Sequence, residues 1–164
     1  MIATIGVESK SEYELERGKP MPNKIHSLLQ RRLTVYLSNQ YAEQFEVFPE
    51  LTFELPEENA TPDLAICKIA PINFEQVKAR EIDPPLGAVE IVSPSQTLSS
   101  FVLKAKKYFD FGMRSYWIVI PELKSIYVFN QSNEYKAFVK EGTVRDEVLG
   151  IEIPMEKIFG DIIV

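Results

Sequence analysis

The sequence is poor in cysteine and histidine and has no long apolar run, and each shortage excludes a class of protein. Cys67 is the only cysteine, so no disulfide framework can form, and we expect a reducing, cytoplasmic compartment. His26 is the only histidine, and there is no zinc-spaced Cys/His cluster, Walker loop or Ser-His-Asp arrangement. No apolar run approaches the ~18 residues that a membrane span needs. The first ten residues lack a basic stretch followed by an apolar one, so we expect no signal peptide.

The composition that remains is that of a globular domain. The chain has 164 residues, of which 45% are hydrophobic and 26% charged, and we expect one domain spanning residues 1–164. The formal net charge of -6 argues against a passive nucleic-acid coat protein, which would be basic. It does not exclude an enzyme that gathers acidic groups in a metal site, because local charge decides that question.

Two segments have the three- and four-residue apolar spacing of amphipathic helices. Residues 23–41 predict one, with Asn23 as N-cap and apolar positions at Ile25, Leu28, Leu29, Leu33, Tyr36 and Leu37. Residues 96–112 predict the other, ended by Gly112, with a stripe of Leu98, Phe101, Val102, Ala105, Tyr108 and Phe109.

The segments between the helices favour strands. Strands are expected within residues 45–55, 60–69, 86–93 and 114–120, a hairpin at 125–140, and a strand followed by a helical turn at 148–164. Residues 12–23 predict a short strand and turn, and residues 71–85, with three prolines, a loop. This order predicts an α/β (α+β) fold with a central mixed β-sheet and flanking helices.

Three charged residues stand out against this pattern: Asp63 opens an apolar strand, Glu90 interrupts another, and Lys104 lies on the helix that follows. Two carboxylates suit a hard divalent cation such as Mg²⁺, which would bind a scissile phosphate and activate water. A lysine beside them can orient that water or stabilise transition-state charge. At ~100° per residue, Lys104 falls at the edge of the apolar stripe, although periodicity alone does not choose between it and Lys106.

Each of these residues also has an ordinary structural interpretation. An Asp after Pro at a strand start commonly bonds its own backbone in a turn, and lysines on a helix flank are usually solvated. Glu90 could face solvent, but its neighbours on the same face are Ala88 and Val92. A buried carboxylate without a partner costs several kcal/mol, so a buried Glu90 requires a cation.

The motifs resemble those of the Uma-type restriction endonuclease family, common in cyanobacteria, within the PD-(D/E)XK nuclease-like superfamily. The resemblance covers nearly the whole chain and is most specific between residues 62 and 119. It rests on Pro62-Asp63, "EIVSPS" at 90–95, Lys104, Tyr108, Gly112 and "YWIV" at 116–119. The opening "YELERGKPMPNKIHSLLQRRL" is a looser match to the family's N-terminal strand, turn and His-bearing helix.

The resemblance implies a restriction-endonuclease-like fold and a metal-dependent DNA endonuclease. Asp63, Glu90 and the backbone carbonyl of Ile91 would hold Mg²⁺ or Mn²⁺. Lys104 would be the catalytic lysine, migrated from the position that Val92 occupies here. DNA would be the partner, and a homodimer would carry two sites for two strands.

Two departures from the family pattern favour a non-catalytic binding or regulatory module of the same fold. Ser100 stands where the family often has Asp four residues before the lysine, and Ile120 replaces an Asp after the Trp. The acidic net charge leaves a third hypothesis, a structural protein with no nucleic-acid partner.

The remaining candidates have weaker signals. His26 is either a helix-start histidine or part of the site, and Glu14 is a further residue that could point at it. Ser95 is expected to cap the second helix, and Tyr116 and Trp117 to lie in the core. The basic residues either contact phosphate or are solvated: Arg31, Arg32, Lys104, Lys106, Lys107 and Arg114.

Overall fold

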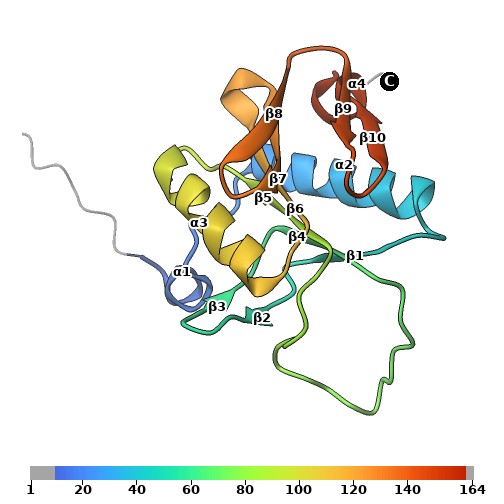
Figure 1. The fold of residues 1–164 in the computed structure, drawn as a ribbon. Helices are drawn as coiled ribbons and strands as arrows, with labels where there is room; N and C mark the ends of the chain where they lie inside the picture. The colour runs from blue at the N-terminus through green and yellow to red at the C-terminus, as the bar shows by residue number, and fades with distance from the viewer. Residues whose placement is uncertain (1–9, 162–164) are drawn as a thin grey trace, which may run out of the picture.

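A six-stranded mixed sheet forms the centre of the computed structural model, which describes residues 10–161 except for the side chain of residue 17. Its strand order is β1-β4-β5-β6-β7-β8, and only the β5–β6 pair is parallel (Figure 1). The strands are β1 (Glu46–Pro49), β4 (Leu64–Cys67), β5 (Gly87–Ile91), β6 (Ser115–Ile120), β7 (Ser125–Gln131) and β8 (Glu134–Val139). Two small hairpins lie beside it: β2 (Phe53–Glu54) with β3 (Asn59–Ala60), and β9 (Thr143–Asp146) with β10 (Ile151–Pro154).

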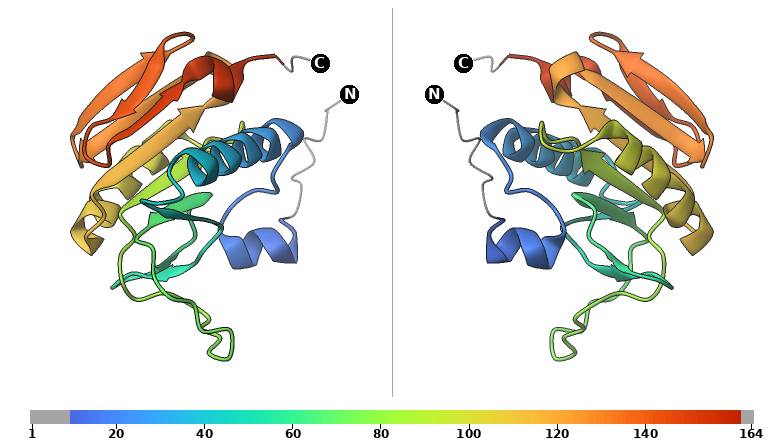
Figure 2. Two further views of the ribbon diagram at one scale, coloured as in Figure 1. Left: turned by 90° about the vertical axis from the view of Figure 1, so that its right-hand side faces the viewer. Right: turned by 90° about the vertical axis from the view of Figure 1, so that its left-hand side faces the viewer.

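Helices cover both faces of this sheet. Helix α2 packs on one face and α3, which connects the parallel strands β5 and β6, on the other (Figure 2). The helices are α1 (Glu12–Arg17), α2 (Lys24–Gln40), α3 (Leu98–Phe111), the 3₁₀ turn η1 (Pro121–Leu123) and α4 (Met155–Phe159). The long loop between β4 and β5 extends away from the sheet (Figure 2). The predicted mixed sheet with flanking helices is therefore confirmed.

Period-two alternation divides the strand residues between two cores. Val89, Ile91 and Trp117 point towards α2 and pack with its buried Leu29, Leu33 and Leu37. Ala88, Tyr116 and Ile118 point the other way and pack with Phe101, Ala105 and Tyr108 of α3. A strand buried on both faces is consistent with the near-continuous apolar runs of β5 and β6.

Of the four predicted ends of the two long helices, three are confirmed. Asn23 caps α2 by accepting a hydrogen bond from the His26 amide at 2.9 Å, and Gly112 ends α3 with a left-handed φ of 112°. The start of α3 differs, because the N-cap is Thr97 and not Ser95, which lies in the preceding turn. The buried stripes are also narrower than predicted, since Ile25, Leu98 and Val102 are about half exposed.

The predicted strand in residues 12–23 is wrong, because the chain forms α1 there. Ser11 and Glu14 make a reciprocal capping box: the Glu14 amide donates to Ser11 Oγ, and the Ser11 amide donates to Glu14 Oε2. Gly18 ends the helix in the left-handed region at φ 65°. Tyr13 and Leu15 are both exposed, so the local capping bonds, and not the burial of apolar side chains, decide the structure.

A buried polar network joins the sheet to the C-terminal hairpin. Asp146 accepts hydrogen bonds from Trp117 Nε1 at 2.7 Å and from the hydroxyl of Ser115. Its other oxygen accepts from the amides of Val148 and Leu149 at 3.1 and 3.0 Å. The placement of Trp117 in the core, as predicted, therefore depends on a carboxylate 29 residues later in the chain.

Replacing Asp146 by alanine is expected to lower the free energy of unfolding by about 3 kcal/mol or more, because several buried donors lose a charged acceptor. Asp110→Ala is the matched control: that carboxylate is exposed on α3 and pairs with Lys106, and its removal should cost less than ~0.5 kcal/mol. Urea unfolding followed by tryptophan fluorescence measures both changes. Equal costs for the two variants would show that the network does not hold the hairpin.

Within residues 10–161, no helix combines the length and the apolarity needed to cross a bilayer.

Candidate functional site

Asp63 and Glu90 lie side by side at one end of the β4–β5 pair. The antiparallel register places Leu64 opposite Val89, so the next position pairs Asp63 with Glu90 on the same face. Each residue is only 1% exposed. The structure thus excludes a solvent-facing Glu90 and brings together two carboxylates that are 27 positions apart in the chain.

The Glu90 carboxylate accepts three side-chain hydrogen bonds. Lys19 Nζ donates to Oε2 at 2.8 Å, while Lys104 Nζ and the Tyr108 hydroxyl donate to Oε1 at 2.9 and 2.8 Å. Burial first, and then the charge of Glu90, raises the pKa of Tyr108 well above its ordinary value. The phenol therefore remains a hydrogen-bond donor at neutral pH.

The Asp63 carboxylate is held equally closely. Lys19 Nζ lies 2.9 Å from Oδ1, and His26 Nε2 and the amide of Ile91 lie 3.1 and 2.7 Å from Oδ2. Burial by itself raises the pKa of Asp63, but the hydrogen bond from His26, the charge of Lys19 and the Ile91 amide outweigh it and lower that pKa. Because Asp63 bonds to the neighbouring strand, the turn interpretation of this residue is wrong.

Lys19 is the residue that sequence reasoning missed. It lies between α1 and α2, is 8% exposed, and places its ammonium between Asp63 and Glu90. Burial alone lowers the pKa of Lys19, but the two carboxylates more than offset that effect and raise it, so the side chain stays charged. The one available signal was electrostatic: two buried carboxylates require more than one cation.

Lys104 lies where the helical periodicity placed it. Its ammonium is 5.6 Å from the ring centre of Phe101 and 5.9 Å from that of Tyr108, and its side chain is 30% exposed. Lys106 and Lys107 instead pair with Asp110 and Glu58 on the surface. The geometry therefore distinguishes Lys104 from Lys106, which the sequence left open.

Other candidates lie outside this cluster. Glu14 is half-buried on α1, where its carboxylate bonds to Ser11 and accepts from the Met21 amide at 3.0 Å. Ser100 is exposed and donates to the Thr97 carbonyl. Arg32 has a structural role, since it donates to the carbonyls of Ile158 and Gly160 at 2.7 Å.

The donor set fits a hard divalent cation. Two carboxylate oxygens lie within 2.9 Å of one nitrogen atom, so they are close enough to share one cation. The Ile91 amide points at Asp63, and the carbonyl of a strand residue lies on the same side as its N–H, so the Ile91 carbonyl faces this edge as well. The described residues contain no group of three or more His, Cys, Asp or Glu side chains suited to a metal, but Mg²⁺ commonly uses one or two carboxylates with several waters.

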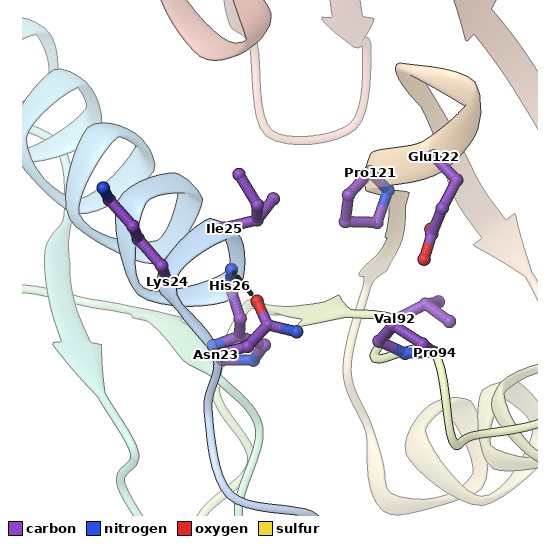
Figure 3. Close-up of a pocket in the computed structure, with 8 residues that line it drawn as sticks. All are labelled: Asn23, Lys24, Ile25, His26, Val92, Pro94, Pro121 and Glu122. Carbon is purple, nitrogen blue, oxygen red and sulfur yellow. Dashed lines mark hydrogen bonds between the residues drawn. The ribbon is translucent and has the colours of Figure 1, made fainter.

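A pocket of about 410 Å³ adjoins the carboxylates (Figure 3). His26 lines both this pocket and the carboxylate site. The walls of the pocket are formed by three segments: the first turn of α2, the residues after β5, and η1. Ile25 and Pro121 lie on opposite sides of it, and Val92 and Pro94 lie below Pro121 in this view (Figure 3). Val92 thus gives the pocket an apolar surface at the position where the superfamily pattern would have a lysine.

Comparisons with known proteins agree with this architecture. Residues 7–156 match the family model described as "Uma2: Putative restriction endonuclease". A crystal structure of a chain described as a "putative nuclease belonging to DUF820", from Anabaena variabilis ATCC 29413, superposes with a TM-score of 0.74. The alignment covers 85% of this chain and 83% of that one at 18% identity, a level at which the likeness shows the fold alone. The search of curated proteins found no match. Because the family model spans nearly the whole described chain, this protein belongs to the Uma2 family and has the fold of its nuclease-like structural neighbour.

Proposed function

We propose that this protein is a metal-dependent endodeoxyribonuclease that hydrolyses DNA phosphodiester bonds at the Asp63–Glu90 site. The observation that carries the proposal is the convergence of two buried carboxylates on one cationic group, with Lys104 beside them. Burial makes such a pair costly to the fold unless it is compensated, and this cost is typical of a site kept for chemistry. The family membership supports a nuclease as the class of enzyme.

In this proposal Asp63, Glu90 and the Ile91 carbonyl hold the divalent ion, Mg²⁺ or Mn²⁺. A divalent ion held there would polarise the scissile phosphate and lower the pKa of a bound water. Lys104 would place a positive charge beside the attacking oxygen, because it already reaches Glu90 from the solvent side of the site. Tyr108 would position the carboxylate by donating to the same oxygen as Lys104.

DNA would approach the carboxylates where Lys104 is partly exposed, and the 410 Å³ pocket shares His26 with that site. The pocket is too small for a duplex, whose major groove alone is ~12 Å wide, so it would contact groups that flank the scissile phosphate. A symmetric dimer would present two such sites to the two strands. Plasmid products distinguish the cases, since paired sites linearise DNA while a single site nicks it first.

Glu90→Ala is expected to lower plasmid cleavage by at least ~1,000-fold, and Lys104→Ala by ~100-fold, because they remove a metal ligand and a transition-state charge. Purified proteins are incubated with supercoiled plasmid and Mg²⁺ or Mn²⁺, and nicked and linear products are measured over time. Glu141→Ala and Lys107→Ala are matched controls, since they remove the same side chains from exposed positions away from the carboxylates.

Cleavage that persists in the Glu90→Ala preparation would identify a contaminating nuclease and contradict the assignment of the site. Loss of cleavage in the Lys107→Ala control would instead indicate that general positive charge on α3 matters more than the position of Lys104.

Tyr108→Phe is expected to lower cleavage by about tenfold, because the Glu90 carboxylate loses a hydrogen bond that fixes its orientation. Tyr116→Phe is the matched control. Its ring packs edge-to-face on Tyr108 at 5.1 Å, and its buried hydroxyl has no hydrogen-bond partner among the described residues. The Tyr116 change should therefore leave cleavage unchanged, and equal effects of the two substitutions would argue that packing, not the hydrogen bond, is responsible.

The second candidate is a binding or regulatory module with this fold and no turnover. Lys19 and Lys104 already neutralise the formal charge of the two carboxylates, and Ile120 is buried where the family often has an acid. Absence of cleavage by every form, with no metal binding by calorimetry and retained DNA binding, would favour this candidate.

A further inference from the structure

The space between the Asp63 and Glu90 carboxylates is filled by one side chain of the protein itself. Lys19 Nζ lies 2.9 Å from Asp63 Oδ1 and 2.8 Å from Glu90 Oε2, so one ammonium group bridges the two carboxylates. These oxygens are among those that the proposed function assigns to a divalent ion. A cation bridging the same two oxygens would occupy the same position.

The remaining free volume is too small for an ion and a lysine together. The cavity lined by Lys19, His26, Asp63, Glu90 and Ile91 measures about 10 Å³. That is at the limit for a single water molecule, which needs ~10–15 Å³. Mg²⁺ dehydrates reluctantly and usually keeps several waters in a protein site. A hydrated ion therefore requires that something leave this cavity.

Lys19 is the contact that can leave with least damage to the fold. Residues 19–22 belong to no helix or strand, and the Met21 amide is held by the side chain of Glu14, on the neighbouring α1. His26, Ile91 and Tyr108, in contrast, are built into α2, β5 and α3. Withdrawal of the Lys19 ammonium breaks two ion pairs, and no sheet hydrogen bond.

We propose that Lys19 is an internal counter-cation that holds the two carboxylates in place and competes with the divalent ion for the position between them. The proposal rests on the proposed function for the identity of the ion, and adds that metal binding displaces Lys19. Lys104, which contacts only the other Glu90 oxygen, keeps its place. Lys19 is thus a positioning residue for the ligand pair, whose side chain moves as the metal binds.

Metal titration of two lysine variants separates competition from general electrostatics. Lys19→Met keeps the length of the aliphatic stem without the charge, and Lys104→Met removes an equal charge from the outer side of Glu90. Calorimetry with MnCl₂, on the full chain and without DNA, should show a Kd at least ~10-fold lower than wild type for Lys19→Met. Lys104→Met should lower Kd by no more than about fivefold, because that ammonium is partly exposed and screened.

Amine labelling tests the same displacement in the unaltered protein. The Lys19 amine is buried and paired, so acetylation followed by mass spectrometry should modify it slowly, while the exposed Lys140 reacts fast in all conditions. Saturating Mn²⁺ should accelerate labelling of Lys19 by ~10-fold or more and leave Lys140 unchanged.

The outcomes distinguish failure of the Lys19 competition from failure of the proposed metal-dependent function. Wild type that binds Mn²⁺, with an unchanged or weakened Kd in Lys19→Met and no change in Lys19 labelling, would overturn the competition and leave the metal site standing. Tighter binding that is equal in both variants would also overturn it, since charge alone would then suffice. Failure of every form to bind Mn²⁺ or Mg²⁺ would overturn the metal-dependent function itself.

Discussion

The burial of two carboxylates at one end of the β4–β5 pair is the constraint on which the rest of the site depends. The register makes Asp63 and Glu90 neighbours, and each is 1% exposed, so their charges cannot be left to solvent. Such a pair is stable only with close donors and opposite charges. The donors identified within the described part of the chain come from the segment before α2, the first turn of α2, the strand β5 itself and helix α3. The site therefore ties the N-terminal part of the described chain to both faces of the sheet.

The two apolar cores stabilise the fold around the buried carboxylate pair. On the α3 face, Glu90 lies beside Ala88, Tyr116 and Ile118, and the Tyr108 hydroxyl on α3 donates to its carboxylate. On the α2 face, Ile91 packs into the larger core, which fixes the strand whose amide holds Asp63. Apolar packing thus sets the backbone to which the donors belong. Hydrogen bonds to charged groups, worth ~1.5–3 kcal/mol each, then fix the carboxylates on that backbone.

Much of this architecture can be predicted from local sequence patterns. The features that could not be predicted are contacts between residues far apart in the chain. The sheet, α2 and α3 follow from the hydrophobic periodicity of the sequence. The placement of Asp63 and Glu90 in one site follows from the need of two buried carboxylates for a shared cation. Residues 12–23 were predicted as a short strand and turn, but the capping box between Ser11 and Glu14 starts helix α1 there. Lys19 was not found because its neighbours Gly18 and Pro20 are typical of a turn, and its burial depends on contacts 44 and 71 positions away. Periodicity carries no information about such contacts.

The positions of the positive charges are consistent with Val92, directly after β5, where the superfamily pattern has a lysine. A lysine on the strand would stand on rigid backbone, and its charge would remain beside the carboxylates in every state of the site. Here the charge is divided between Lys104, anchored on α3 and partly exposed, and Lys19, on a segment outside the sheet. In the proposed metal-bound state one cation would stay with Glu90 while the other leaves, and Val92 lines the neighbouring pocket. If the proposed function holds, this division would separate two tasks that a single lysine at position 92 would have to combine: Lys19 would stabilise the carboxylate pair without the ion, and Lys104 would assist the chemistry with the ion bound.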